Sequence, residues 1–203
     1  MPKYHKILIA INAAVLVWSA INPHDYLTLL LETFPLIIGF IVLALTYKKF
    51  QLTNLTYTLI TTQAIILMVG GHYTYVEVPF FSWLQDVGIF SRNNYDKLGH
   101  FIQGFGPAII AREILLRTSP LRPGKWLNFL VVAIAGFIAA IYEIIEWVTA
   151  ASIGSASDSF LATQGYVWDT QTDMALCLIG AILSLLLLSK LHDRQLNEIG
   201  TKN

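Results

Sequence analysis

Long apolar stretches alternate with short polar segments along the whole chain. A helix needs about 20 consecutive apolar residues to cross a bilayer. Several stretches are apolar all round, whereas a surface helix of a soluble protein is apolar along one stripe only. We predict six spans, at residues 4–21, 27–47, 55–75, 96–116, 127–150 and 169–191. The pattern predicts an all-α polytopic membrane protein, a bundle of about six transmembrane helices forming a single integral membrane domain over residues 1–203.

Two segments depart from this simple alternation. The stretch at 96–116 is the least apolar of the six and gives the weakest hydropathy signal. Residues 76–95 form a longer connection that contains Pro79 and Trp83. Aromatic side chains gather at membrane–water interfaces, so this connection is predicted to hold a short interfacial helix.

Composition agrees with a membrane protein and excludes several other classes. Of 203 residues, 55% are hydrophobic and only 13% are charged, whereas soluble domains contain about 25% charged residues. The net charge of zero gives no electrostatic reason to expect nucleic acid as a partner. The apolar spans instead predict membrane lipids as partners. The single cysteine, Cys177, excludes an intramolecular disulfide and a cysteine-rich metal site.

Basic residues are distributed unequally between the two sides that the six spans define. Only Arg92 and Lys97 fall on one side. The side of both termini receives the other lysines and arginines: Lys3, Lys6, Lys48, Lys49, Arg112, Arg117, Arg122, Lys125, Lys190, Arg194 and Lys202. Cytoplasmic loops are rich in Lys and Arg, so we expect a multi-pass protein of the bacterial inner membrane with both termini in the cytoplasm. Loss of the span at 96–116 would break this asymmetry, which supports that span.

Acidic residues concentrate at the opposite, outer ends of the spans, where three spans carry polar pairs. The pairs are Asp96 with His100, Glu143 with Glu146, and Asp169 with Asp173. Residues three or four apart share one face of a helix, and lipid cannot solvate a carboxylate. We therefore predict that the three helices turn these side chains into one outward-facing pocket.

Simpler roles remain open for some polar residues. Asp96 and Asp169 can also cap helix N-termini, where free N–H groups stabilise a carboxylate. Lys97 is either a counter-ion of the acidic pocket or an anion binder. Glu32 is predicted to be interfacial, and Glu113 to be neutralised locally at the cytoplasmic interface.

The Glu143–Glu146 pair has no such simple explanation. It lies near the C-terminal end of its helix, where the helix dipole disfavours acids. Two adjacent carboxylates also repel each other unless a cation or a shared proton intervenes. The candidate metal ligands are His100, Glu143, Glu146, Asp169, Asp173, Asp96 and His72. Carboxylate and imidazole ligands suit Zn, Mn, Fe, Mg or Ca, and no contiguous metal-binding motif selects among these metals.

Four motifs carry a resemblance to a known family. They are Gly71–Thr74, Tyr95–Phe101, Glu143–Trp147 and Gly165–Met174. On these motifs nearly the whole chain resembles the YjdF-like bacterial inner-membrane proteins, a family without an assigned activity. The resemblance implies a membrane location and draws attention to the same polar residues, but it implies no substrate.

The C-terminal half is also loosely similar to VanZ-type membrane proteins, which contain an Asp-Lys-x-x-His-Phe stretch. Asp96, Lys97 and His100 match that stretch, together with the phenylalanine that follows. Two positions depart from the VanZ pattern, because Glu146 replaces a glutamine and Cys177 replaces an asparagine. These departures add charge to the pocket and leave a shared activity undecided.

Three functional hypotheses follow. The first is a metal-dependent membrane enzyme acting on a lipid or envelope substrate, with Glu143, Glu146, His100 and Asp173 as ligands or acid–base groups. The second is a proton- or cation-coupled transporter that uses the same carboxylates. The third is a structural or regulatory membrane subunit. The sequence names neither the substrate nor the oligomeric state.

Overall fold

The computed structural model describes residues 1–153 and 164–200, and in this part helices are joined by turns and short irregular segments, with no strands. Its helices are α1 (Lys3–Ser19), α2 (Tyr26–Thr46), α3 (Asn54–His72), α4 (Pro79–Asp86), α5 (Tyr95–Thr118), α6 (Lys125–Ile153) and α8 (Asp169–Gly200). The all-α prediction is confirmed. The short helix α4 lies inside the connection that was predicted to hold an interfacial helix.

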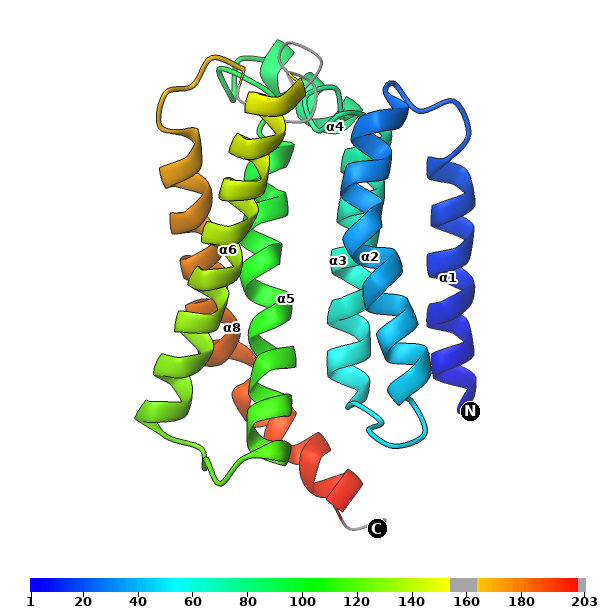
Figure 1. Ribbon diagram of the computed structural model, residues 1–203, viewed down its shortest axis with the longest axis vertical. Coiled ribbons are helices and arrows are strands. Elements are labelled where there is room, and N and C mark those ends of the chain that lie inside the picture. Colours follow the sequence, from blue (N-terminus) through cyan, green and yellow to red (C-terminus); the bar gives the residue numbers. More distant parts are fainter. Residues whose placement is uncertain (154–163, 201–203) are drawn as a thin grey trace.

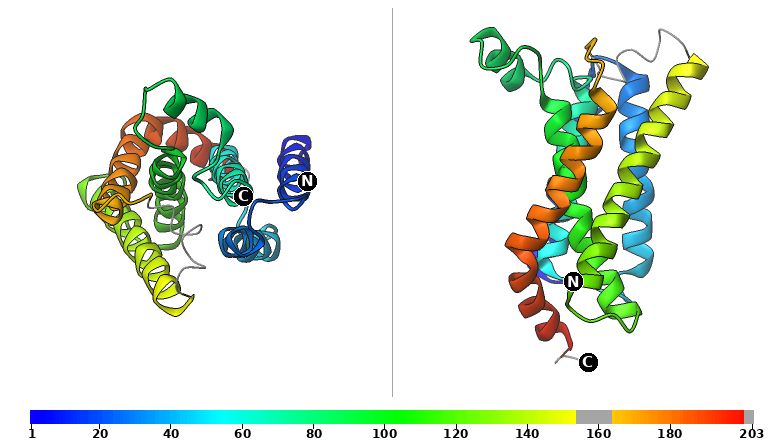
Figure 2. Two further views of the ribbon diagram at one scale, coloured as in Figure 1. Left: turned by 90° about the horizontal axis from the view of Figure 1, so that it is seen from above. Right: turned by 90° about the vertical axis from the view of Figure 1, so that its left-hand side faces the viewer.

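The six long helices lie side by side along a common axis (Figure 1). Helices α3 and α5 pack together at the centre, with α1 and α2 beside α3 and with α6 and α8 beside α5 (Figure 2). The bundle therefore consists of two groups of three helices that meet along α3 and α5. Both termini lie at one end of the bundle, which we call the terminal end, and α4 lies at the opposite, distal end.

Among the described helices, three are long and apolar enough by themselves to cross a membrane: α2, α6 and α8. Large apolar side chains on these helices point outward, as lipid-facing residues do; Leu45, Phe129 and Leu186 are examples. The central helix α5 is less apolar because it packs against three other helices, α3, α6 and α8. Its polar side chains, including His100 and Glu113, are buried inside the bundle.

Helices α5 and α8 approach so closely that their backbones touch. A Cβ atom at Gly104 would lie 2.6 Å from the carbonyl carbon of Cys177, and one at Gly180 would lie 3.1 Å from the carbonyl carbon of Phe101. Small residues allow such close helix contacts in membranes. His100 lies four residues before Gly104, and Asp173 lies four residues before Cys177. The glycine contact therefore brings these two polar residues to the same level of the bundle.

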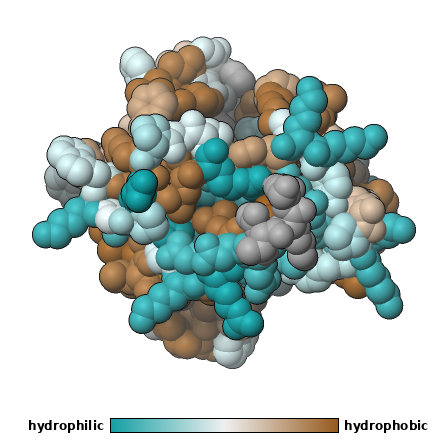
Figure 3. All heavy atoms as spheres, turned by 90° about the horizontal axis from the view of Figure 1, so that it is seen from below, coloured by the Kyte–Doolittle hydropathy of each residue, from teal (hydrophilic) through white to brown (hydrophobic). Residues whose placement is uncertain are grey.

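A buried polar network joins α3, α5 and α8 at the terminal end, where hydrophilic side chains also surround the helix ends (Figure 3). Glu113 is fully buried and accepts hydrogen bonds from the hydroxyls of Thr53 and Thr56. Its carboxylate also lies 2.8 Å from Arg117 and 3.2 Å from His192. Glu113 is thus neutralised locally, as predicted, and its side chain is buried inside the terminal end of the bundle.

Candidate functional site

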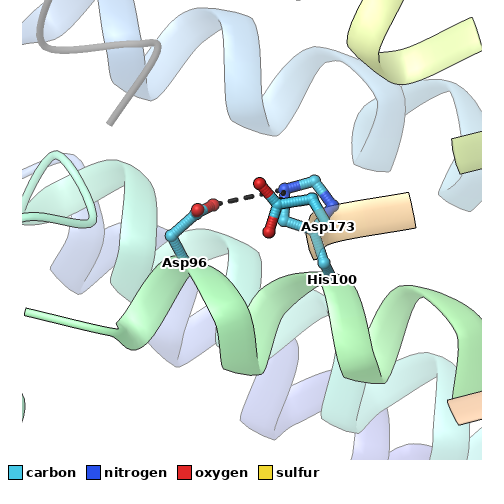
Figure 4. A group of neighbouring side chains, drawn as sticks. All are labelled: Asp96, His100 and Asp173. Atoms are coloured by element: carbon cyan, nitrogen blue, oxygen red, sulfur yellow. Dashed lines mark ion pairs between the residues drawn. The ribbon is translucent and has the colours of Figure 1, made fainter. Parts of the chain in front are cut away.

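The polar pairs predicted on α5 and α8 meet at the distal end of the bundle. Asp96 and His100 project from α5 toward Asp173 of α8 (Figure 4). The His100 Nε2 atom lies 3.2 Å from Asp96 Oδ1 and 3.9 Å from Asp173 Oδ1. All three side chains are buried, with exposed fractions of 8%, 6% and 2% for Asp96, His100 and Asp173.

Basic side chains neutralise the aspartates of this group. Lys97 Nζ lies 2.7 Å from Asp169 Oδ1, 2.7 Å from Asp173 Oδ1 and 3.4 Å from Asp96 Oδ2. Arg92 adds a second contact of 2.8 Å to Asp169 Oδ1. Lys97 is therefore a counter-ion that holds the first turn of α8 against the first turn of α5.

The two glutamates of α6 have a different environment on the other side of His100. Glu143 Oε1 lies 3.9 Å from His100 Nδ1. One potential ligand atom from each of His100, Glu143 and Glu146 lies within 4.8 Å of the others. Glu143 Oε1 is buried and has no hydrogen-bond partner among the described residues. Neither a lysine nor an arginine of residues 1–153 and 164–200 forms a salt bridge with these glutamates.

Glu32 of α2 extends the site, although the sequence suggested only an interfacial position. This carboxylate is 3% exposed and accepts hydrogen bonds of 2.8 Å from the Tyr75 hydroxyl and 2.9 Å from the Tyr142 hydroxyl. Tyr142 belongs to α6, so this contact joins the two groups of three helices. Tyr142 directly precedes Glu143 in the sequence, so Glu32 is also linked to the glutamate pair of α6.

A small polar cavity connects Glu32 with the rest of the site. Its volume is about 50 Å³, which is enough for a few water molecules, since one water needs roughly 10–15 Å³ of such space. The cavity is lined by Glu32, Gln63, Leu67, Tyr75, Asp96, Gly99, His100, Gln103, Tyr142 and Glu146. The site therefore reaches from α5, α6 and α8 across the centre of the bundle to α2 and α3.

His72 lies outside this group, although it was one of the candidate ligands. Its Nδ1 atom is 3.0 Å from the carbonyl oxygen of Ser19, and its ring packs against Trp18 with a centroid distance of 4.5 Å. This histidine ties the end of α3 to the end of α1. Among the predicted ligands, the structure thus brings together Asp96, His100, Glu143, Glu146, Asp169 and Asp173.

Comparisons with known proteins identify the family of the chain. A family described as predicted membrane protein (DUF2238) matches residues 4–194. The chain belongs to this family. It is also 48% identical over 186 residues to the inner membrane protein YjdF of Escherichia coli (strain K12), covering 92% of the chain and 89% of that relative. No solved structure matches the chain.

Membership of this family confirms the resemblance noted from the four sequence motifs, and with it the assignment as a membrane protein. Neither the family description nor the name of the relative states a reaction, a metal or a transported species. Arguments about function therefore rest on the geometry of the site.

Proposed function

We propose that this DUF2238 protein is a membrane enzyme that holds a divalent cation with His100, Glu143 and Glu146 and acts on a lipid or envelope substrate at the distal end of the bundle. The observation that carries the proposal is a pair of glutamates with which no lysine or arginine of the described residues forms a salt bridge. Asp169 and Asp173 have lysine and arginine partners, whereas Glu143 presents a buried oxygen without a hydrogen bond.

Physical chemistry favours a cation between these side chains. Burial of a carboxylate costs several kcal/mol unless nearby charges and hydrogen bonds compensate it, and two carboxylates that share a site repel each other. The ion pair of Glu143 with His100 is long, at 3.9 Å. Carboxylate oxygens combined with one imidazole are ligands for Zn, Mn, Fe, Mg or Ca. A cation at this position would neutralise Glu143 and Glu146 in the way that Lys97 neutralises Asp173.

The residues around His100 match the surroundings of metal-binding histidines. Such histidines usually donate the second ring N–H to a carboxylate, which fixes the ring. Here Asp96 Oδ1 lies 3.2 Å from Nε2, so that Nδ1 faces Glu143. Gln103 Oε1 lies 3.0 Å from Nδ1 and would have to turn aside when the ring binds a cation. A bound divalent cation would supply an activated water molecule or polarise a substrate oxygen.

The membrane orientation forms part of the same proposal. We infer that residues 1–203 form one integral membrane domain of the inner membrane in which all six long helices cross, with both termini in the cytoplasm. The shared terminal end, the unequal distribution of basic residues and the inner-membrane relative support this orientation. A reporter fused after Lys125 should show a cytoplasmic location. An external location would exclude the six-span arrangement.

The metal proposal is tested by elemental analysis of detergent-purified protein. We expect stoichiometric divalent metal in the wild type and its loss in Glu143→Gln/Glu146→Gln, which removes both charges and keeps the side-chain shapes. Asp86→Asn is the matched control, because Asp86 is an exposed acid of α4 at the same end of the bundle. Metal-free wild type, or equal metal in the double variant, would contradict the proposal.

Cation- or proton-coupled transport is the second candidate, and one observation favours it. The polar cavity continues from Glu146 to Glu32 and Gln63, between the two groups of three helices. Transporters commonly bind their substrates between such groups, near the middle of the membrane. Ion flux into vesicles that depends on Glu143 and Glu146 would support transport, whereas metal binding without flux would support the enzyme.

A further inference from the structure

A long apolar groove opens on the bundle below the candidate site, toward the terminal end. It has a volume of about 500 Å³ and lies between α2, α3 and α5. Its walls include Gly39 and Leu43 of α2, Ile60 of α3, and Ile110 and Ile114 of α5. The walls of the groove are almost entirely apolar, so the groove suits an apolar occupant.

The length of the groove matches one leaflet of a bilayer. Along α2 it runs from Pro35 to Thr46, and a helix rises 1.5 Å per residue, so its length is about 16 Å. Half of the hydrocarbon core of a bilayer is about 15 Å thick. Gln63 lines both the groove and the polar cavity of the candidate site, so the groove reaches the wall of that cavity. A hydrocarbon chain that enters at the terminal end therefore ends beneath that site.

Three basic residues lie beside the mouth of the groove at the terminal end: Lys48, Lys49 and Arg117. Phe50 lines the mouth, and the Arg117 guanidinium lies over its ring at 3.8 Å from the centroid. Arg117 also donates to the carbonyl oxygen of Gln51 and pairs with Glu113. Lys48 and Lys49 are exposed directly before Phe50. Basic side chains next to a membrane attract anionic lipid headgroups by about 1 kcal/mol each.

We propose that this groove binds an anionic phospholipid of the leaflet at the terminal end. One acyl chain lies between α2 and α5, and the phosphate lies at Lys48, Lys49 and Arg117. The bound chain fills the space between the two groups of three helices and supports the wall that carries Gln63. This lipid site is separate from the proposed metal site and does not depend on it.

Gly39 provides a sharp test of the groove. Gly39 lines the groove and a Cβ atom there has no heavy atom within 4 Å, so Gly39→Phe is expected to place its ring in the groove. Ile41→Phe is the matched control, because Ile41 lies on the same helix, is 53% exposed and does not line the groove. The Lys48→Gln/Lys49→Gln variant tests the headgroup and alters only exposed side chains.

The measurement is native mass spectrometry of purified full-length protein after incubation with phosphatidylglycerol or phosphatidylcholine of the same chain length. Wild type and Ile41→Phe should retain several-fold more phosphatidylglycerol than phosphatidylcholine. Gly39→Phe should retain several-fold less of both lipids, and Lys48→Gln/Lys49→Gln should lose the preference for phosphatidylglycerol. Wild-type retention by a correctly folded Gly39→Phe variant, or equal loss in Ile41→Phe, would overturn the chain site. An unchanged preference in the lysine variant would overturn the headgroup site.

Discussion

The contact between α5 and α8 predicts a large effect of a single methyl group. In Gly104→Ala the new Cβ would lie 2.6 Å from the carbonyl carbon and 2.9 Å from the Cα of Cys177. Carbon atoms in contact lie about 3.5–4.0 Å apart, so the helices must separate by about 1 Å. Overpacking of this kind costs about 1–3 kcal/mol. For a chain of this length each kcal/mol lowers Tm by roughly 2–4 °C, so we expect a fall in Tm between about 2 and 12 °C.

Gly106→Ala is the matched control for this prediction. It lies two residues away on the same helix, and its Cβ would have no neighbour nearer than 3.6 Å, an ordinary contact distance. Alanine is the better helix former by about 0.5–1 kcal/mol, but Pro107 follows directly and disfavours a Cβ at the preceding helical position. These two effects oppose each other, so this variant should melt close to the wild-type temperature. Intrinsic fluorescence of the detergent-solubilised protein provides the melting curve. If Gly104→Ala melts like Gly106→Ala, the backbone contact between α5 and α8 is wrong.

Three further predictions concern the polar residues of the distal end. Tyr142→Phe removes one donor to the buried Glu32 carboxylate and should destabilise the protein by about 1.5–3 kcal/mol, measured by denaturation. Lys97→Met leaves buried aspartates without their main counter-ion and should cost about 3–5 kcal/mol; Asp173→Asn in the same chain should recover part of this loss. His72→Ala should lower Tm and leave the metal content of the purified protein unchanged, because His72 contacts the end of α1 and not the candidate site.

Each of these predictions has a result that would contradict it. Wild-type stability of Tyr142→Phe would show that Glu32 does not depend on this hydroxyl. A double variant no more stable than Lys97→Met would show that Lys97 and Asp173 are not coupled. Loss of metal from a folded His72→Ala variant would return His72 to the ligand set.

The part of the site that was predictable depends on spacing within one helix. Asp96 and His100, and likewise Glu143 and Glu146, lie three or four residues apart, so each pair must share a face wherever its helix packs. Because lipid does not solvate carboxylates, the helix faces that carry these pairs are expected to point into the bundle and therefore toward one another. The local pattern and the membrane together were enough to predict this part of the site.

The remaining site residues depend on contacts between distant parts of the chain. Glu32 is a lone acid near the start of an apolar helix, and its partners Tyr75 and Tyr142 lie 43 and 110 residues further along. No periodicity within α2 indicates these partners. His72 follows two glycines, and a Cβ at Gly70 would lie 2.6 Å from Cε1 of Tyr75. That glycine makes room for the tyrosine that binds Glu32, and it does not position His72 as a ligand.

The counter-ions of α5 have a consequence for how the protein is made. In the proposed six-span arrangement Lys97 enters the membrane with α5, but Asp169 and Asp173, which neutralise it, belong to α8 and are synthesised more than 70 residues later. Until α8 arrives, α5 is a weakly apolar segment with exposed polar groups, which the lipid disfavours. Stable insertion of α5 therefore awaits the last helix. A chain that is truncated before α8 should leave α5 outside the bilayer or be degraded.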